Sequence, residues 1–200
     1  MIRCLLCKKI SFSHICTSCQ NSFLKPSLST RLLNGDFKVF SFYKYVDIAP
    51  LLKTKHTHIG ASVYKILADN AMKKFAENFS FDNPVYALGI DDHCKHGYAH
   101  TAILTRALKS DVIIPLYGKL RASNSVRYSA QSLAYRLNHK RGFVYTQSTG
   151  WHSHDKEPKD IILVDDIITS GTTILEAVKV IEKAQSTPIF ALTLADAREL

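Results

Sequence analysis

Hydrophobic residues along this chain follow two spacings that alternate from Phe37 to the last residues. Short apolar runs predict β-strands, and apolar residues that recur every three or four positions predict helices. Strands are predicted over residues 37–43, 84–90, 112–116, 161–164 and 189–194, with a short edge strand over 142–145. Helices are predicted over residues 60–77, 98–108 and 129–139, and from Thr172 onward. This alternation predicts an α/β fold, with a mostly parallel sheet flanked by helices.

The first 24 residues follow neither spacing and are organised by cysteines instead. Cys4 and Cys7 are two residues apart, eight residues follow, and Cys16 and Cys19 repeat the pair. Two such pairs can give four thiolates to one tetrahedral zinc ion. Metal binding contributes about 10 to 16 kcal/mol, which so short a segment cannot gain by burying apolar surface. We therefore predict a four-cysteine zinc ribbon over residues 1–24 and a second domain over residues 25–200.

Other arrangements of the cysteines stay open from the sequence. The four could form disulfides, His14 could replace one of them as a ligand, and iron could take the place of zinc. Cys94 is predicted to be a plain thiol. The sequence shows neither a signal peptide nor an apolar stretch of the about 20 residues that a membrane span needs. A cytoplasmic location is therefore expected, where thiols and metal sites are commoner than disulfides.

Residues 161–173 combine an apolar strand, two acids and a loop rich in hydroxyl groups. Asp165 and Asp166 follow the strand, and Thr169-Ser170-Gly171-Thr172-Thr173 leads into a helix. Small hydroxylated residues at the start of a helix can surround a phosphate with donors. The carboxylates would repel a phosphate, but they suit ribose hydroxyls or a Mg²⁺ shared with a pyrophosphate. An ordinary strand–turn–helix with one capping hydroxyl is the alternative, and it leaves the paired carboxylates unexplained.

The order of two hydrophobic residues, two acids, two aliphatic residues and Thr-Ser-Gly-Thr-Thr resembles the signature of type I phosphoribosyltransferases. The resemblance implies a type I phosphoribosyltransferase-like domain that binds 5-phosphoribosyl-1-pyrophosphate with Mg²⁺. By that likeness, Asp165 and Asp166 contact the ribose hydroxyls. The 5′-phosphate is held by Thr169, Ser170, Gly171, Thr172 and Thr173. The resemblance assigns no catalytic residue in this chain.

Charge is distributed unevenly along the chain, whose net charge is +9. Residues 1–60 hold nine Lys and Arg against two Asp and Glu, whereas residues 165–200 hold three against six. A basic amino-terminal part suits a polyanion such as nucleic acid, although a generally basic surface is equally open. Candidate contacts for pyrophosphate or DNA are Lys95, Lys119, Arg121 and Arg127. A further basic patch, either solvated or in contact with a polyanion, contains Lys53, Lys55, His56 and His58.

A four-cysteine ribbon followed by a phosphoribosyltransferase domain resembles the ComF (ComFC/GntX) family of competence proteins over nearly the whole chain. The likeness includes the run from Gln131 through Arg136 and Asn138 to Phe143. The sequence departs from the family at residues 96–100, where His-Gly-Tyr-Ala-His replaces Arg-Gly-Phe-Asn-Gln, and at Asp91-Asp92-His93, which replaces a proline-rich loop. The two acids there would repel a pyrophosphate unless Mg²⁺ bridges them.

The ComF resemblance implies a DNA-uptake protein of natural transformation. Such a protein would bind single-stranded DNA and a 5-phosphoribosyl-1-pyrophosphate-like ligand on the cytoplasmic side. It would lie at the inner membrane, near other components of the uptake machinery. Two alternatives stay open: an active transferase that moves phosphoribose to a nucleobase, and a non-catalytic regulator that senses the ligand. A transferase needs a closing loop, for which residues 117–130 are a candidate, and a base pocket, which the sequence does not identify. Enzyme activity is therefore left undecided by the sequence.

Overall fold

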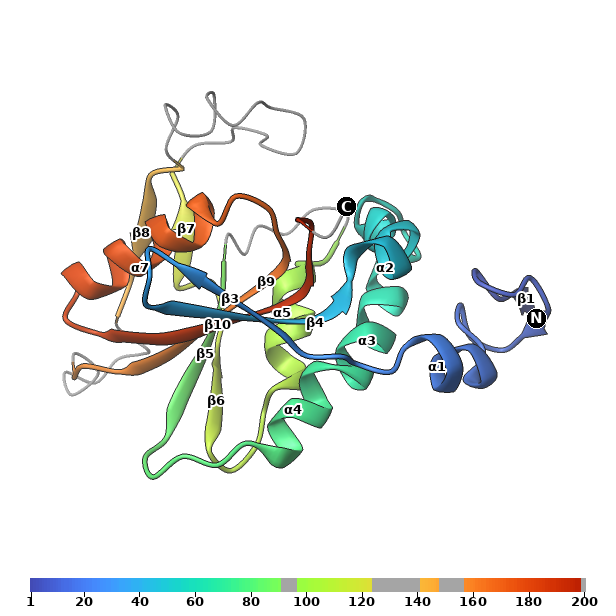
Figure 1. Cartoon of the computed structure of the whole chain (residues 1–200), viewed down its shortest axis with the longest axis horizontal. Coiled ribbons are helices and arrows are strands. Elements are labelled where there is room, and N and C mark those ends of the chain that lie inside the picture. Colours follow the sequence, from blue (N-terminus) through green and yellow to red (C-terminus); the bar gives the residue numbers. More distant parts are fainter. Residues whose placement is uncertain (91–96, 124–140, 148–156, 199–200) are drawn as a thin grey trace.

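The computed structural model describes residues 1–90, 97–123, 141–147 and 157–198. Its centre is a six-stranded sheet in the order β3-β4-β10-β9-β5-β6 (Figure 1). Strands β4, β10, β9, β5 and β6 run parallel to one another, and the edge strand β3 runs antiparallel to β4. The strands are β3 (Ser29–Leu33), β4 (Phe37–Lys44), β5 (Val85–Gly89), β6 (Ile113–Leu116), β9 (Asp160–Ile168) and β10 (Thr187–Asp196). The predicted α/β fold with a mostly parallel sheet is confirmed.

The central strand β9 sends alternate side chains into two hydrophobic layers, as the two-residue repeat of a strand requires. Ile162 and Val164 join the layer under the helices of one face, and Ile161 and Leu163 join the layer under the other. One face is covered by α2 (Tyr45–Leu52), α3 (Gly60–Asn70), α4 (Met72–Asn78) and α5 (His100–Ala107), and the other by α7 (Thr172–Lys183) (Figure 1). Burial on both faces explains why the predicted strand at 161–164 is continuously apolar.

The helix predicted over residues 60–77 is divided into α3 and α4 at Ala71. Its backbone has φ −114° and ψ −73°, away from helical values. The amide of Ala71 still donates to Leu67, and Phe75 donates to Ala71, so the apolar spacing continues across the bend. The bend places Ala71 and Met72, both buried, against the core.

Several elements were not predicted from the apolar spacing. Edge strand β3 and helix α2 were both missed, and α2 contains Pro50, which ordinarily argues against a helix. A 3-10 helix, η1 (Lys53–His56), follows α2 directly. Strand β7 (Leu120–Ala122) was also missed, and it pairs with β8 (Phe143–Tyr145), the short strand predicted over 142–145, in a sheet of their own. The helix predicted over 129–139 lies wholly outside the described residues, which resume at 141.

The amino-terminal ribbon is a small unit packed at one end of the molecule (Figure 1). It consists of β1 (Ile2–Arg3), β2 (Ile10–Ser11) and α1 (Thr17–Phe23). Ile15 and Leu24 are buried in the same cluster as α3, and the His14 ring lies 2.9 Å from the Ser62 hydroxyl. His14 therefore faces α3. Across the ranges that the structure describes, no helix combines the length and apolar character needed to cross a membrane.

Candidate ligand-binding site

The acid pair lies where β9 extends past the end of its neighbour β5. Gly89 of β5 pairs with Val164, and the amide of Ile90 donates to the Val164 carbonyl. Beyond this point β9 continues beside β10 to Ile168. Asp165 and Asp166 are thus inside β9, which ends four residues later than the predicted strand at 161–164. Ligands of open α/β sheets bind at the carboxyl ends of such strands.

Asp166 is 4% exposed and is surrounded by donors from three different elements. Its Oδ2 atom accepts from the Lys55 ammonium at 2.9 Å and from the Tyr64 hydroxyl at 2.8 Å. The His100 Nε2 atom lies 3.8 Å from the same oxygen. Burial alone would raise the pKa of Asp166, but His100, Lys55 and Tyr64 together lower it well below its usual range. Asp166 is therefore a carboxylate at neutral pH.

Asp165 has different hydrogen-bond partners from Asp166. Its Oδ1 atom accepts the backbone N–H of Asp166 at 2.8 Å. Burial and the neighbouring Asp166 charge raise its pKa above the ordinary range of an aspartate. One ligand atom each from His100, Asp165 and Asp166 lies within 4.8 Å of the others. Carboxylate oxygens fit the oxygen preference of Mg²⁺, and they also fit the hydroxyl donors of a ribose.

This difference between the two acids predicts how stability depends on pH. A folded pKa above the unfolded value of about 3.9 stabilises the protein at low pH, and that contribution is lost as pH rises through the folded pKa. We therefore expect the ionisation of Asp165 to lower the free energy of unfolding above pH 4, by at most about 1.4 kcal/mol per pH unit. Asp165→Asn should remove this decline. Urea unfolding of both proteins from pH 4 to 9 measures it, and parallel pH curves would contradict the assignment.

The loop after β9 turns sharply at Gly171 and enters α7. Gly171 has φ +81°, and a Cβ there would lie 2.6 Å from the Leu33 side chain. A residue with a side chain is therefore excluded both by conformation and by contact. The Ser170 and Thr172 hydroxyls lie 2.9 Å apart. Gly171 itself is the N-cap of α7 and has no side chain to cap it, while the Ser170 hydroxyl accepts the Thr172 amide at 3.4 Å. One hydroxyl thus meets one amide of the helix start, as the capping alternative expects, and the other amides of the first turn can receive an anion.

Arg31, on β3, fixes the outer side of this loop and was missed from the sequence. Its guanidinium donates to the Thr169 carbonyl at 2.5 Å and to the Ser170 carbonyl at 3.2 Å. The same side chain, 11% exposed, lies 3.4 Å from Asp196 at the end of β10. Because the two carbonyls are drawn toward Arg31, Arg31 constrains how these loop peptides are turned. Arg31 is therefore a positioning residue for residues 169–173, the loop predicted to hold a phosphate and called the phosphate loop below.

We expect Arg31→Met to lower the free energy of unfolding by about 1 to 3 kcal/mol, because two loop carbonyls and Asp196 lose a charged donor. Affinity for inorganic phosphate or ribose 5-phosphate should fall in parallel. Lys38→Met is the matched control, since Lys38 is exposed on the adjacent strand β4. Urea unfolding and calorimetric titration check both effects. Equal behaviour of the two variants would show that Arg31 does not position the loop.

The basic residues predicted to contact pyrophosphate or DNA are only partly described. Arg121 is exposed on β7 and donates to the Gly118 carbonyl at 3.1 Å, and Lys119 precedes it. Lys95 and Arg127 lie outside the described residues, as do Asp91, Asp92, His93 and Cys94. Of the other basic patch, Lys55 is directed at Asp166, whereas Lys53 is exposed. The patch is thus divided, and Lys55 belongs to the acid pair.

The residues directly before β8 are hydrogen-bonded to α7, the helix that follows the phosphate loop. The Glu176 carboxylate of α7 accepts the backbone N–H of Gly142 at 2.7 Å and that of Arg141 at 3.0 Å. These residues come directly before β8. Strand β8, which follows the candidate closing loop of residues 117–130 in the sequence, is therefore tied to the same helix as residues 169–173.

The four predicted metal ligands converge on one point in the ribbon. The Sγ atoms of Cys4, Cys7, Cys16 and Cys19 all lie within 4.8 Å of one another. Those of Cys7 and Cys16 are 3.7 Å apart, close to the about 3.8 Å edge of a tetrahedron with zinc–sulfur bonds of about 2.3 Å. All four are free thiols. The cluster is thus arranged to hold a tetrahedral ion such as zinc.

Local backbone groups already favour a thiolate in this cluster. Burial would raise the pKa of the Cys4 thiol, but backbone donors from Cys16, Cys7 and Leu6 lower it to about 6. Burial and the neighbouring sulfurs raise the pKa of Cys19 to about 12. Without a metal, therefore, Cys4 ionises before Cys19, and a cation would stabilise the Cys19 thiolate.

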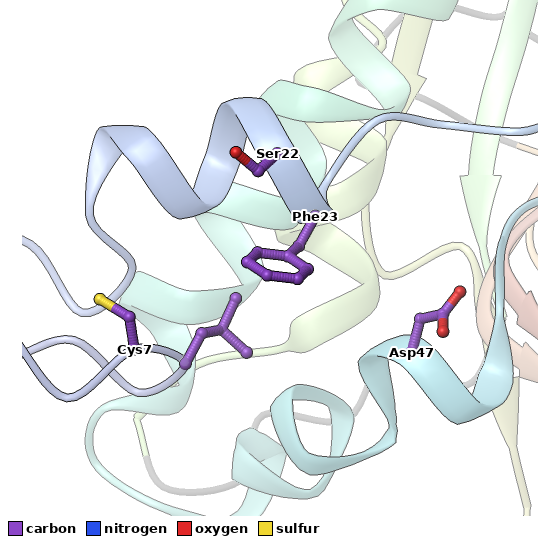
Figure 2. Close-up of a pocket in the computed structure, with 5 residues that line it drawn as sticks. Cys7, Ser22, Phe23 and Asp47 are labelled. Atoms are coloured by element: carbon purple, nitrogen blue, oxygen red, sulfur yellow. The ribbon is translucent and has the colours of Figure 1, made fainter.

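A surface cleft of about 450 Å³ lies beside this cluster, between the ribbon and α2. Figure 2 shows the Phe23 ring and Cys7 on the ribbon side and the Asp47 carboxylate across from them. Leu6 and Ser22 complete the lining. None of these residues belongs to the phosphate loop, so the cleft is separate from the acid-pair site.

The chain belongs to the phosphoribosyl transferase domain family, whose model matches residues 63–200. It is 32% identical over 68 residues to an orotate phosphoribosyltransferase of Coccidioides immitis (strain RS), which is 34% of this chain and 29% of that protein. The aligned part of the chain thus spans less than a third of that curated relative.

Solved structures that resemble the chain include two adenine phosphoribosyltransferases. The Saccharomyces cerevisiae enzyme is 15% identical, with a TM-score of 0.45 over 90% of this chain and 88% of that one. The Trypanosoma brucei enzyme is also 15% identical, with a TM-score of 0.45 over 88% of each chain. A hypoxanthine phosphoribosyltransferase from Staphylococcus aureus is 14% identical, with a TM-score of 0.38 over 66% and 62%. The family assignment rests on the matched family model.

Proposed function

We propose that this chain binds 5-phosphoribosyl-1-pyrophosphate together with Mg²⁺ at the end of β9. The observation that carries the proposal is the placement of two carboxylates and a glycine-turned loop on consecutive residues 165–173, at one strand end and one helix start. The carboxylates suit a ribose diol, and the amides of the helix start suit a phosphate. These are the two chemical parts of a 5-phosphoribosyl group.

Each part of the ligand has a matching group in the chain. Asp165 and Asp166 would accept the ribose hydroxyls, and the amides and hydroxyls of residues 169–173 would donate to the 5′-phosphate. Arg31 would keep the loop in the required conformation. Mg²⁺, when bound, would neutralise the pyrophosphate and take oxygen ligands from it. The residues that hold the pyrophosphate itself are proposed among Lys119 and Arg121, with Lys95 and Arg127.

Calorimetric titration of the zinc-replete chain tests the proposal by comparing three ligands in Mg²⁺. We expect 5-phosphoribosyl-1-pyrophosphate to bind more tightly than ribose 5-phosphate, and pyrophosphate alone to bind most weakly. If pyrophosphate alone binds as tightly as 5-phosphoribosyl-1-pyrophosphate, the site recognises only charge. Release of pyrophosphate on adding one nucleobase would identify an active transferase. Binding without release for any base would favour a non-catalytic ligand-sensing role.

A second proposed activity is binding of single-stranded DNA by the ribbon, as in DNA uptake during natural transformation. The observation that favours it is the ribbon surface, which combines aromatic and basic side chains. Phe12 is 94% exposed and Phe23 is 66% exposed, and Arg3, Lys8 and Lys9 are exposed on the same short segment. Exposed aromatic rings stack on bases, and cations track the phosphates. Zinc in the four-cysteine cluster would fix this surface.

The DNA-uptake reading places the protein on the cytoplasmic side of the inner membrane, next to other components of the uptake machinery. Residues 1–24 would be the DNA-contacting domain and residues 25–200 the ligand domain. If the ligand changes DNA affinity, DNA must change ligand affinity by the same factor. Measuring both directions decides whether the two sites are coupled.

We expect Phe12→Ala to weaken binding of a labelled single-stranded oligonucleotide by about 1 to 3 kcal/mol, because one stacked base is lost. Phe81→Ala is the matched control, since Phe81 is 41% exposed on the second domain. The logarithm of the binding constant should fall with the logarithm of salt at about −0.7 per neutralised phosphate. Fluorescence anisotropy at several salt concentrations measures both. Equal loss in the two variants would exclude the ribbon as the contact.

A further inference from the structure

Lys55 makes an ion pair with Asp166 inside the proposed ligand site. Its ammonium lies 2.9 Å from Oδ2, and the side chain is 22% exposed. The neighbouring Lys53, in the same short helix η1, is exposed. Lys55 also precedes residue 63, where the match to the family model begins. The family match therefore does not account for this cation.

Three contacts fix the backbone around Lys55. The Tyr98 hydroxyl donates to the Lys55 carbonyl at 2.7 Å. A Cβ on Gly60 would lie 2.0 Å from that hydroxyl and 2.3 Å from the Thr54 carbonyl, so only glycine leaves room for the contact. The Thr57 amide donates to the Thr54 carbonyl at 2.8 Å and closes the turn. Lys55 is thus held by a built arrangement that spans η1, α3 and the start of α5.

The ammonium lies against the Asp166 oxygen that a protein-bound divalent cation would need as a ligand. Asp165, Asp166 and His100 are close enough to ligate one ion, and Asp166 Oδ2 is the oxygen that both Lys55 and His100 approach. A Mg²⁺ bound to this oxygen at about 2.1 Å would lie no more than about 5 Å from the Lys55 ammonium. Two cations so close repel strongly in a partly buried site. A resident metal at the acid pair is therefore opposed while Lys55 is present.

We propose that Lys55 is a built-in cation that replaces a protein-bound Mg²⁺ at the acid pair. It keeps Asp166 oriented toward the ribose, so ligand binding requires only the Mg²⁺ that travels with the pyrophosphate. Lys55 is a positioning residue, since it acts through Asp166. The role toward the ligand rests on the proposed function. The exclusion of metal from the free protein does not.

The exclusion of metal is tested without ligand by titrating the zinc-replete full chain with Mn²⁺ and following its paramagnetic resonance signal. Wild type and Lys53→Met should bind no Mn²⁺ at the acid pair. Lys55→Met and Lys55→Gln should each gain one Mn²⁺ site, which Asp166→Asn then removes. Two neutral variants are used so that one poorly folded protein does not decide the result. A Mn²⁺ site in wild type, or none in a folded neutral variant, overturns the proposal.

The role in ligand binding is tested by titrating 5-phosphoribosyl-1-pyrophosphate at increasing Mg²⁺. At low Mg²⁺, Lys55→Met should bind about 10- to 100-fold more weakly than wild type, and high Mg²⁺ should restore most of the loss. Lys55→Arg should keep the wild-type Mg²⁺ dependence. An equal loss at every Mg²⁺ concentration means a structural role only and overturns the proposal. Absence of binding by wild type overturns the proposed function instead, while the Mn²⁺ result still stands.

Discussion

Asp166→Asn should remove most binding of 5-phosphoribosyl-1-pyrophosphate and lower the free energy of unfolding by about 2 to 4 kcal/mol. The carboxamide cannot offer the charged acceptor that a ribose hydroxyl prefers, so affinity should fall about tenfold to more than a hundredfold. The loss of stability has a separate cause. Lys55 would keep its charge in a largely enclosed position, with the partner oxygen replaced by a weaker one.

The stability effect also has a pH signature of its own. The pKa of Asp166 is lowered in the folded protein, so its contribution is present above the unfolded pKa of about 3.9 and is lost as pH falls below that value. The difference in unfolding free energy between wild type and Asp166→Asn should therefore be largest at neutral pH. It should shrink as the solution is acidified below pH 4.

Urea unfolding at pH 7 and pH 3 and calorimetric ligand titration measure these effects. Asp69→Asn is the matched control, because it removes the same charge from an exposed ion pair with Lys65 and should cost less than about 1 kcal/mol. Adding Lys55→Met to Asp166→Asn should recover most of the stability without recovering the binding. If the double variant is as unstable as the sum of the two single changes, the ion pair does not carry the effect.

The second large effect is expected when the ribbon loses its metal. Chelation, or Cys16→Ser, should unfold residues 1–24, because about 10 to 16 kcal/mol of metal-binding free energy would be lost from a segment with few buried side chains. Ile15 and Leu24 would leave the core cluster, and the contact between His14 and Ser62 would break. The phosphoribosyltransferase-like domain should stay folded, since its sheet does not include the ribbon strands.

Hydrogen exchange resolved by segment measures this loss. Protection should disappear over residues 2–20 on adding a strong chelator and return with zinc, while β9 and β10 keep theirs. Cys94→Ser is the control for a cysteine substitution outside the cluster. Unchanged protection of the ribbon after complete metal removal would show that packing against α3 is enough to fold it.

Features that are local in the sequence could be predicted from it. The cysteine pairs and residues 164–173 each carry their chemistry within one short segment, so spacing alone reveals it. Arg31 and Lys55 could not be assigned in this way, because they reach their partners across 138 and 111 residues. Lys55 was recognised as basic, but its position after the apolar segment 45–52 was the only hint that it is directed inward.

The differences in the fold have equally specific reasons. The helix bend at Ala71 leaves the apolar spacing intact, so the spacing cannot reveal it. Strand β9 continues past Val164 because β10 accompanies it to Ile168, a pairing with no local signal. The strand predicted over 161–164 was therefore correct, but the acid pair could be placed within β9 only from the pairing of β9 with β10.

Hydrogen exchange of the zinc-replete chain with and without 5-phosphoribosyl-1-pyrophosphate and Mg²⁺ tests the central claim most directly. If residues 165–173 hold the phosphoribosyl group, added ligand should slow exchange across the end of β9, the phosphate loop and the first turn of α7. Residues 1–24 should be unaffected by the ligand alone. Slower exchange only in the ribbon or around Lys119 and Arg121, with none at residues 165–173, would contradict the claim.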